Sequence, residues 1–180
     1  MSTTLIAPHE TSKHTASERW TMDSARSTVE FEVEHIWGLH TVHGCFRRSE
    51  GEYVVGPDGA AIELAIDAAS VDTGVAMRDE HLRSADFLYV ALHPRVRFTS
   101  TGVTPLPSGD VHVTGELEAA GTSVPLAFDA SVSHLDGELE LETTTTVDQR
   151  RFGMAEGPLG NVRPPTTVHV RARLVRDETQ

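Results

Sequence analysis

The sequence predicts an all-β protein: an eight-stranded antiparallel barrel with one short helix, at about residues 77–86, near one opening. Three observations carry this prediction. Apolar and polar residues alternate along about eight short segments, and Gly, Pro and Asp gather between these segments. A single segment has the composition of a helix instead of a strand.

The clearest strand runs from Thr28 to Glu34. Val29, Phe31 and Val33 share one face there and glutamates occupy the other, which is the pattern of a half-buried strand. The same alternation predicts seven further strands, at 42–46, 62–66, 96–98, 111–117, 124–130, 139–141 and 168–174. Turn residues between them favour an antiparallel sheet, with turns at 56–59, 105–110, 120–121 and 136–137.

The segment 77–86 breaks the alternation, because it contains no β-branched residue, Gly or Pro. Asp79 and Arg83 stand four residues apart, a spacing that brings opposite charges together on a helix. We expect Asp72 or Thr73 to cap its N-terminus. One helix cannot cover a large sheet, whereas a sheet that closes into a barrel has no exposed edges.

The 180-residue chain fits one domain, for which we expect residues 19–176, with 1–18 and 177–180 as polar tails. A formal net charge of −12 argues against nucleic-acid partners, and no apolar stretch is long enough for stable membrane insertion. Met1–Ser17 lacks the basic start and apolar centre of a secretory signal, so we expect a cytoplasmic protein. A single cysteine, Cys45, excludes an internal disulfide.

The longest motif spans Ser70 to Phe87 and continues to Thr101. It reads S-V-D-T, then R-D-E-H-L-R-S-A-D-F, then a proline and F-T-S. This order resembles the pattern of the YceI family. Shorter matches flank it, among them a G-x-F…G turn at 44–51 and a G-x-L-x-x-x-G hairpin at 115–121. The resemblance extends over about residues 19–175.

Two positions depart from that family pattern. Leu88 stands where a second phenylalanine is usual, and the stretch 149–153 lacks the expected aspartate. Both departures fall where a ligand is expected to be touched, so the resemblance specifies the fold more closely than it specifies the ligand.

The resemblance implies a lipocalin-like barrel whose elongated apolar lumen binds an isoprenoid-like lipid, such as a quinone or polyprenyl compound, as a carrier or store. We expect no cofactor, and because relatives often pair, a homodimer is compatible with the resemblance. An apolar chain that leaves water gains about 0.8 kcal/mol per buried CH₂. We expect the ligand to contact Phe31, Val33, His35, Trp37, Phe46, Leu64, Met77, Arg78, His81, Leu82, Phe87, Phe98, Phe128, Phe152 and Met154, with Trp37 and Met77 at the mouth.

Two interpretations stay open for the charged helix residues Arg78, Asp79, His81, Arg83 and Asp86. In the first, Arg78 or His81 meets a polar head group of the ligand. In the second, which we favour, the charges pair with one another and tie the helix to the barrel rim.

Enzyme chemistry is the alternative function. The chain has no nucleophile elbow, Walker loop or dinucleotide motif. His81 with Asp79 or Asp86 is the candidate acid–base pair of a cofactor-free isomerase or lyase that acts on a hydrophobic substrate in the same cavity.

A metal site is the third hypothesis, and the densest histidine group for it is His35, His40 and His43. On a strand, His40 and His43 have opposite parity and point to opposite faces. We therefore expect no metal, although a turn between His35 and His40 leaves the hypothesis open.

Overall fold

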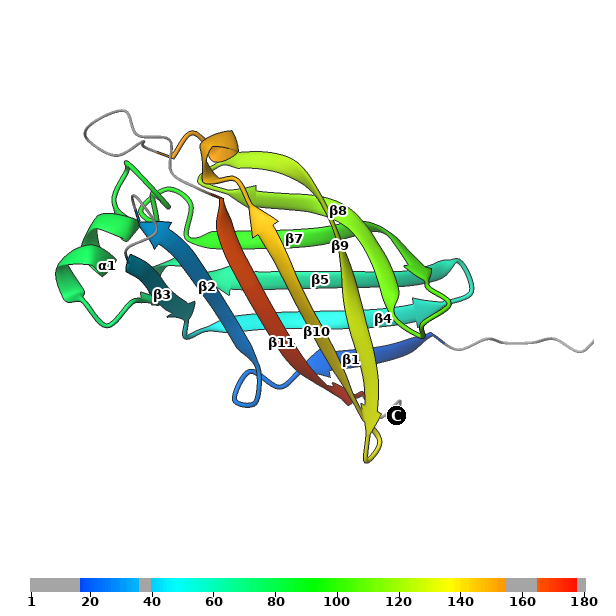
Figure 1. Ribbon diagram of the computed structural model, residues 1–180. Coiled ribbons are helices and arrows are strands. Elements are labelled where there is room, and N and C mark those ends of the chain that lie inside the picture. The colour runs from blue at the N-terminus through cyan, green and yellow to red at the C-terminus, as the bar shows by residue number, and fades with distance from the viewer. Residues whose placement is uncertain (1–16, 36–39, 155–164, 178–180) are drawn as a thin grey trace, which may run out of the picture.

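The structure is a computed structural model that describes residues 17–35, 40–154 and 165–177. Within these residues lie eleven strand segments, one α-helix and two short 3₁₀ helices (Figure 1). The strands are β1 (Glu18–Met22), β2 (Thr28–His35), β3 (His40–Phe46), β4 (Ser49–Gly56), β5 (Gly59–Asp67), β6 (Val71–Asp72), β7 (Arg95–Pro105), β8 (Val111–Ala119), β9 (Thr122–Leu135), β10 (Glu138–Val147) and β11 (Thr166–Arg176). The helices are α1 (Ala76–Arg83), η2 (Ala68–Ser70) and η3 (Gln149–Phe152).

Eight strands close into a barrel, in the order β1, β4, β5, β7, β8, β9, β10 and β11. The ring closes where Trp20 of β1 pairs with Arg176 of β11. Beside β1, β2 also pairs with β11, and β3 and β6 continue the sheet from there. Every pairing in the sheet is antiparallel. The predicted eight-stranded antiparallel barrel is confirmed.

Each predicted alternating segment lies within a strand, but the alternation did not predict β1, β4 or the two-residue strand β6. The motif at 44–51 was interpreted as a turn, whereas Gly51 lies inside β4, opposite Leu64 of β5. A Cβ atom at Gly51 would lie 2.8 Å from the carbonyl oxygen of Glu63. Glycine at this position therefore permits the close approach of two strands and does not mark a turn.

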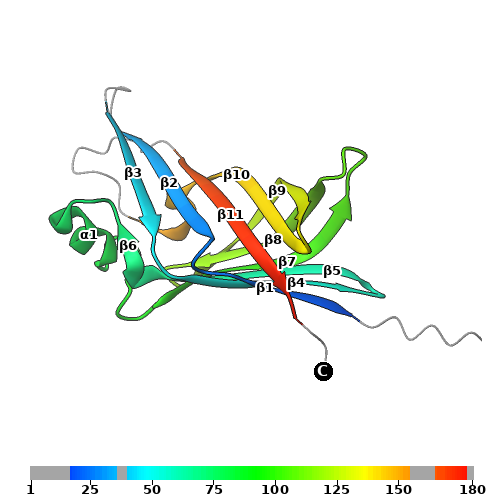
Figure 2. The same cartoon turned by 90° about the horizontal axis from the view of Figure 1, so that it is seen from below.

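Helix α1 covers one end of the barrel, and it is shorter than the predicted segment 77–86. It starts after Val75, which makes no side-chain capping hydrogen bond, so the predicted cap at Asp72 or Thr73 is wrong. Asp72 instead accepts a 2.8 Å hydrogen bond from the Gly74 amide. Figure 2 shows α1 beside β6, at the end of the barrel away from the last residues of β11. None of the helices in the described ranges has the length and apolar character required to span a bilayer.

The core consists of three apolar clusters inside the barrel. The α1-end cluster includes Val29, Phe31, Ala68, Val71, Leu88, Val124 and Phe152. The far-end cluster comprises Trp20, Met22, Leu139, Leu141, Ala172 and Leu174, and the third cluster comprises Phe98, Val111, Val113 and Ala130 on β7–β9. Leu64 of β5 packs against all three clusters, so it marks the place where they meet.

Candidate functional site

A cavity of about 120 Å³ lies inside the barrel, around the meeting point of the three clusters. This is roughly ten times the space that one water molecule requires. Its wall is almost entirely apolar, and it includes Leu64, Phe98, Leu126, Phe128, Val168 and Val170. A cavity of this size and character suits an apolar group and disfavours a charged one.

Strand alternation explains why the wall is apolar. On β11, Val168, Val170, Ala172 and Leu174 all border the cavity, and each is two residues from the next, so they share one face of the strand. The residues between them face outward. The same parity brings Leu64 of β5 to the interior.

Three glutamates, Glu52, Glu63 and Glu142, border the cavity from outward-facing positions. Glu52 forms an ion pair with Arg19, and Glu142 pairs with Arg171 at 3.0 Å. These carboxylates are neutralised or solvated on the outer face, so they do not place charge in the interior.

Leu64, Phe98 and Phe128 are the predicted ligand residues that line the cavity. The rings of Phe98 and Phe128 lie 5.2 Å apart between centroids and are tilted by 50°. This tilted arrangement is typical of favourable aromatic pairs. The pair joins β7 to β9 over the intervening strand β8 and forms one side of the cavity wall.

Seven other predicted residues lie at the α1 end, outside the cavity wall. Phe31, Val33, Phe46, Leu82, Phe152 and Met154 belong to the α1-end cluster or pack against it. The rings of Phe31 and Phe46 lie 5.6 Å apart. The buried ring of Phe87 meets His81 edge-on, with 4.9 Å between centroids. These side chains close the barrel beneath α1.

Asp79 and Arg78 are bonded to Thr73, just before α1. The Asp79 side chain, in a residue only 7% exposed, accepts hydrogen bonds from the Thr73 amide (2.8 Å) and hydroxyl (2.5 Å). Arg78 donates to the Thr73 hydroxyl (2.7 Å) and carbonyl (2.8 Å). These bonds fix the chain that enters the helix.

Arg83 secures the other end of α1. Its guanidinium donates to the carbonyl of Ala69 (2.8 Å) and to that of Val71 (2.7 Å). The predicted pairing of Asp79 with Arg83 is wrong, because both side chains are used in bonds to η2, β6 and the segment before α1. The charges therefore tie the helix to the barrel, as the favoured interpretation predicts, but through backbone groups and Thr73.

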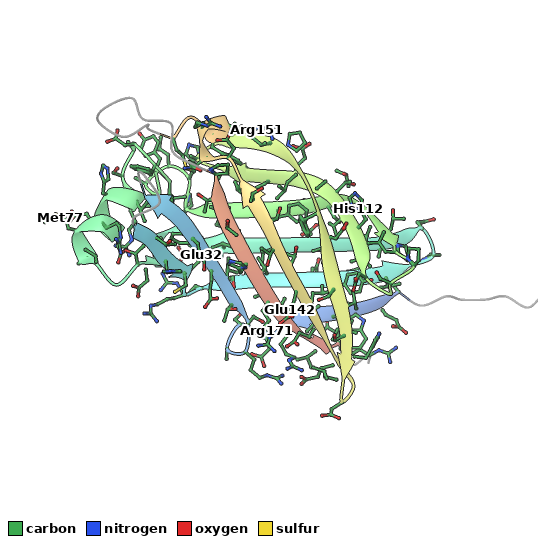
Figure 3. The ribbon with its side chains drawn as sticks, viewed as in Figure 1. Glu32, Met77, His112, Glu142, Arg151 and Arg171 are labelled. Carbon is green, nitrogen blue, oxygen red and sulfur yellow. The ribbon has the colours of Figure 1, made fainter. Side chains whose placement is uncertain are left out.

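Of the two predicted mouth residues, only Met77 lies among the described residues. Met77 is 82% exposed on α1 and points away from the barrel (Figure 3). His81 is also exposed. His35 contributes backbone to β2, and Trp37 lies outside the described residues.

The histidine hypothesis is tested only in part. Across the ranges that the structure describes, no group of three or more His, Cys, Asp or Glu side chains is placed to hold a metal ion. His43 Nδ1 lies 3.2 Å from a Glu32 carboxylate oxygen on the outer face, and His169 Nε2 lies 3.9 Å from the same oxygen. The side chains of His35 and His40 are outside the description.

Charge is gathered on the outer face of β10 and β11 (Figure 3). Arg171 Nε lies 3.0 Å from Glu140 and 3.0 Å from Glu142, while Arg173 lies 3.1 Å from Glu140. The hydrogen bond from Arg171 holds the pKa of Glu140 below its ordinary value. This network stabilises the wall without placing an ionised group in the interior.

Several cavity residues were not predicted, among them Leu126, Ala130, Thr143, Thr145 and Val168. Leu126, Ala130 and Val168 were already assigned to alternating strands, so strand parity alone could have identified them. Thr143 and Thr145 lie in a run of four threonines. That run has no apolar alternation from which to infer the inward positions.

Residues 20–175 match the model of the YceI-like domain family. A UPF0312 protein of Shewanella baltica strain OS185 is 32% identical over 165 residues, which cover 85% of this chain and 82% of that protein. A UPF0312 protein of Azotobacter vinelandii is 36% identical over 105 residues, which cover 57% of this chain and 54% of that protein. In this second comparison the chain spans about half the length of its relative.

Solved structures share the fold. BcnA of Burkholderia cenocepacia has a TM-score of 0.74 at 18% identity, covering 87% of this chain and 99% of that one. A domain from Saccharophagus degradans, described as polyisoprenoid binding and implicated in plant cell wall breakdown, has a TM-score of 0.71 at 16% identity. That comparison covers 91% of this chain and 100% of the domain. At these identities the likeness establishes the barrel alone.

Proposed function

Because this chain belongs to the YceI-like domain family, we propose that its barrel binds the apolar chain of an isoprenoid-like lipid and serves as a carrier or store. The observation that carries the proposal is the almost wholly apolar cavity beside Leu64, Phe98 and Phe128. The polyisoprenoid-binding description of the Saccharophagus domain supports the ligand class, since that domain shares the barrel.

The physical driving force is burial of hydrocarbon. Each CH₂ group that leaves water contributes about 0.8 kcal/mol, so a five-carbon isoprene unit contributes about 4 kcal/mol. An apolar cavity of about 150 Å³ accepts benzene in another protein. The cavity here, at about 120 Å³, therefore suits a segment of about one isoprene unit. A longer chain requires side chains such as Phe128 to move, or it must extend out of the cavity.

We propose a quinone or a polyprenyl compound as the lipid. Quinone and polyprenyl tails consist of the same repeating units, and the cavity wall supplies no charged group that would select one head group. A cytoplasmic location and a homodimer remain predictions. Cell fractionation and light scattering of the purified protein test them separately from ligand binding.

The enzyme alternative gains no support from the described residues. Its candidate acid–base groups, His81 with Asp79 or Asp86, lie on α1 or just after it and do not border the cavity. The Asp79 carboxylate already accepts hydrogen bonds from the amide and hydroxyl of Thr73. A substrate in the cavity would not meet this pair in the conformation that the structure describes.

Native mass spectrometry of freshly purified protein tests the proposal. We expect a bound mass that matches a prenyl lipid or quinone, or stoichiometric uptake when the protein is incubated with farnesol, geranylgeraniol or a quinone. Protein that is ligand-free after purification and takes up none of these compounds would overturn the proposal.

A further inference from the structure

Both ends of the barrel are closed by packed side chains. At the α1 end, Val71 is 1% exposed and Phe152 is 5% exposed, and both belong to the α1-end cluster. At the opposite end, Leu139 and Leu174 are each 2% exposed. The cavity lies between the α1-end cluster and the far-end cluster, so a ligand that enters through either end must separate buried side chains.

The barrel wall is incomplete between β9 and β10. Their ladder begins at the hairpin and ends where Ser131 pairs with Glu142. Beyond that pair, β9 is bonded in ladders only to β8, and β10 only to β11, along the described strands. Figure 1 shows the two strands diverging from the hairpin toward η3. We call the opening between residues 125–129 and residues 143–147 the slit.

Backbone groups of β9 face the slit. The Thr143 hydroxyl donates a 2.7 Å hydrogen bond to the Asp129 carbonyl, and Arg151 donates at 3.5 Å to the Pro125 carbonyl. The amide and carbonyl of one strand residue point to the same side, so alternate residues from 125 to 129 present their backbone to the slit. Pro125 has no amide hydrogen to offer. Proline within a sheet is confined to edges of this kind, so the sequence itself is suited to an unpaired edge here.

Side-chain exposure shows where the interior is accessible. Among the inward residues of β9, Val124 and Ala130 are buried, whereas Leu126 and Phe128 between them are only partly buried. The inward residues of β10 change in the same way. Leu139 and Leu141 are buried, and then Thr143, Thr145 and Val147 are partly buried. On β10 this loss of burial begins where the ladder ends, whereas on β9 the inward Val132, inside the ladder, is already partly buried.

The cavity reaches this place, since Leu126 and Phe128 from β9 and Thr143 and Thr145 from β10 all belong to its wall. We propose that the apolar chain of the ligand enters and leaves the barrel sideways, through the slit between β9 and β10. This inference rests on the proposed function. The slit also accommodates a chain longer than the cavity, whose polar end remains outside among the exposed Thr144 and Thr146.

A reversible cross-link across the slit tests the route. If the ladder continued past Ser131 and Glu142, Asp129 would lie opposite Thr144, and both side chains are exposed on the outer face. Two cysteines there, Asp129→Cys and Thr144→Cys, combined with Cys45→Ser, allow one disulfide that holds the strands together. The probe is dansyl-labelled farnesol, with association measured by stopped-flow fluorescence. Oxidation should lower the association rate at least roughly tenfold, and reduction should restore it.

A second variant covers the case in which the cross-link does not form. Thr143→Val keeps the shape of the side chain but removes its bond to the Asp129 carbonyl, so the slit should open more readily. Association and dissociation should both accelerate by roughly threefold or more. Thr104→Val, which alters an exposed hydroxyl on β7, away from the slit, is the matched control and should leave both rates unchanged.

Entry beneath α1 is the competing route. Leu82→Ala loosens the packing of α1 on the α1-end cluster. The inference is overturned if Leu82→Ala accelerates association while Thr143→Val and the cross-link leave the rate unchanged. If the unmodified protein does not bind the probe at all, the proposed function itself fails, and this inference fails with it.

Discussion

The ring of Phe98 lies over Gly115 on the neighbouring strand, and a Cβ atom at Gly115 would come within 2.6 Å of the ring's Cζ atom. Phe31 and Gly44 repeat this relationship near α1, as direct partners in the β2–β3 ladder. A Cβ atom at Gly44 would lie 2.8 Å from Phe31 Cε2. In both cases an aromatic ring covers a glycine in the sheet. The two rings differ in place, because Phe98 lines the cavity and Phe31 packs in the α1-end cluster.

This difference gives a paired prediction. In Gly115→Ala the new Cβ meets the Thr99 carbonyl oxygen as well as the Phe98 ring, so the change should lower the free energy of unfolding by at least about 1–3 kcal/mol and weaken the binding of prenyl probes. Gly44→Ala, where the nearest atoms all belong to the Phe31 ring, should destabilise the fold by no more than this, with affinity preserved. Urea unfolding and fluorescence titration measure the two quantities. Equal losses of affinity in both variants would show that Phe98 has no special part in the site.

Much of the fold could be predicted from the sequence, because inward and outward residues alternate wherever one face of a strand is buried. The segment from Thr28 to Glu34 and the segment 168–174 are both strands, and the barrel closes as expected. Strand β4 was missed because Glu50, Gly51 and Glu52 stand next to one another, without the apolar–polar alternation that marks the other strands.

The site was less predictable, because parity shows which side chains point inward but not which of them leave space. Phe31 and Phe98 look alike in the sequence. Their roles differ because Phe31 packs in a cluster with Leu88 and Phe152, whereas Phe98 borders the cavity. The slit exists because the ladder between β9 and β10 ends at Ser131 and Glu142. The sequence indicates this unpaired edge only through Pro125, which has no amide hydrogen to donate.

Filling the cavity should abolish binding without unfolding the barrel. Val170→Trp places an indole in the cavity that Val170 borders, whereas Val175→Trp adds the same group at an exposed position of β11. We expect affinity for geranylgeraniol to fall at least roughly tenfold in the first variant and to stay unchanged in the second. Titration followed by intrinsic or probe fluorescence measures this. Undiminished binding by a folded Val170→Trp protein would place the ligand elsewhere.

The contact between Asp79 and Thr73 should matter for stability and not for ligand selection. Asp79→Ala leaves the amide and hydroxyl of Thr73 without their acceptor in a buried place, which should cost about 1–3 kcal/mol. Glu80→Ala, at an exposed position of the same helix, is the control and should cost much less. Denaturant unfolding of both variants measures the difference. A larger effect on affinity than on stability would instead favour contact between the helix and the ligand.

Acid should weaken the outer network through Glu140. Its hydrogen bond with Arg171 lowers the pKa of Glu140 in the folded protein below the ordinary value of 4.5. The carboxylate therefore stabilises the fold fully above that ordinary value, and this stabilisation is lost as the pH falls through the lowered folded pKa.

The corresponding variant is Glu140→Gln, which should remove about 1 kcal/mol at neutral pH and flatten the decline of stability between about pH 5 and pH 3. Thermal unfolding across this range measures the slope. Glu118→Gln, on an exposed outward position of β8, should retain the slope of the unmodified protein. A slope that is identical in all three proteins would contradict a role for the Glu140 network in acid sensitivity.

The most direct test of the central claim is a crystal structure of the protein after saturation with geranylgeraniol. We predict continuous electron density for the prenyl chain inside the barrel, in contact with Leu64, Phe98 and Phe128. Density for the lipid only on the outer surface, with these three side chains packed as they are without it, would contradict the claim that the barrel interior is the binding site.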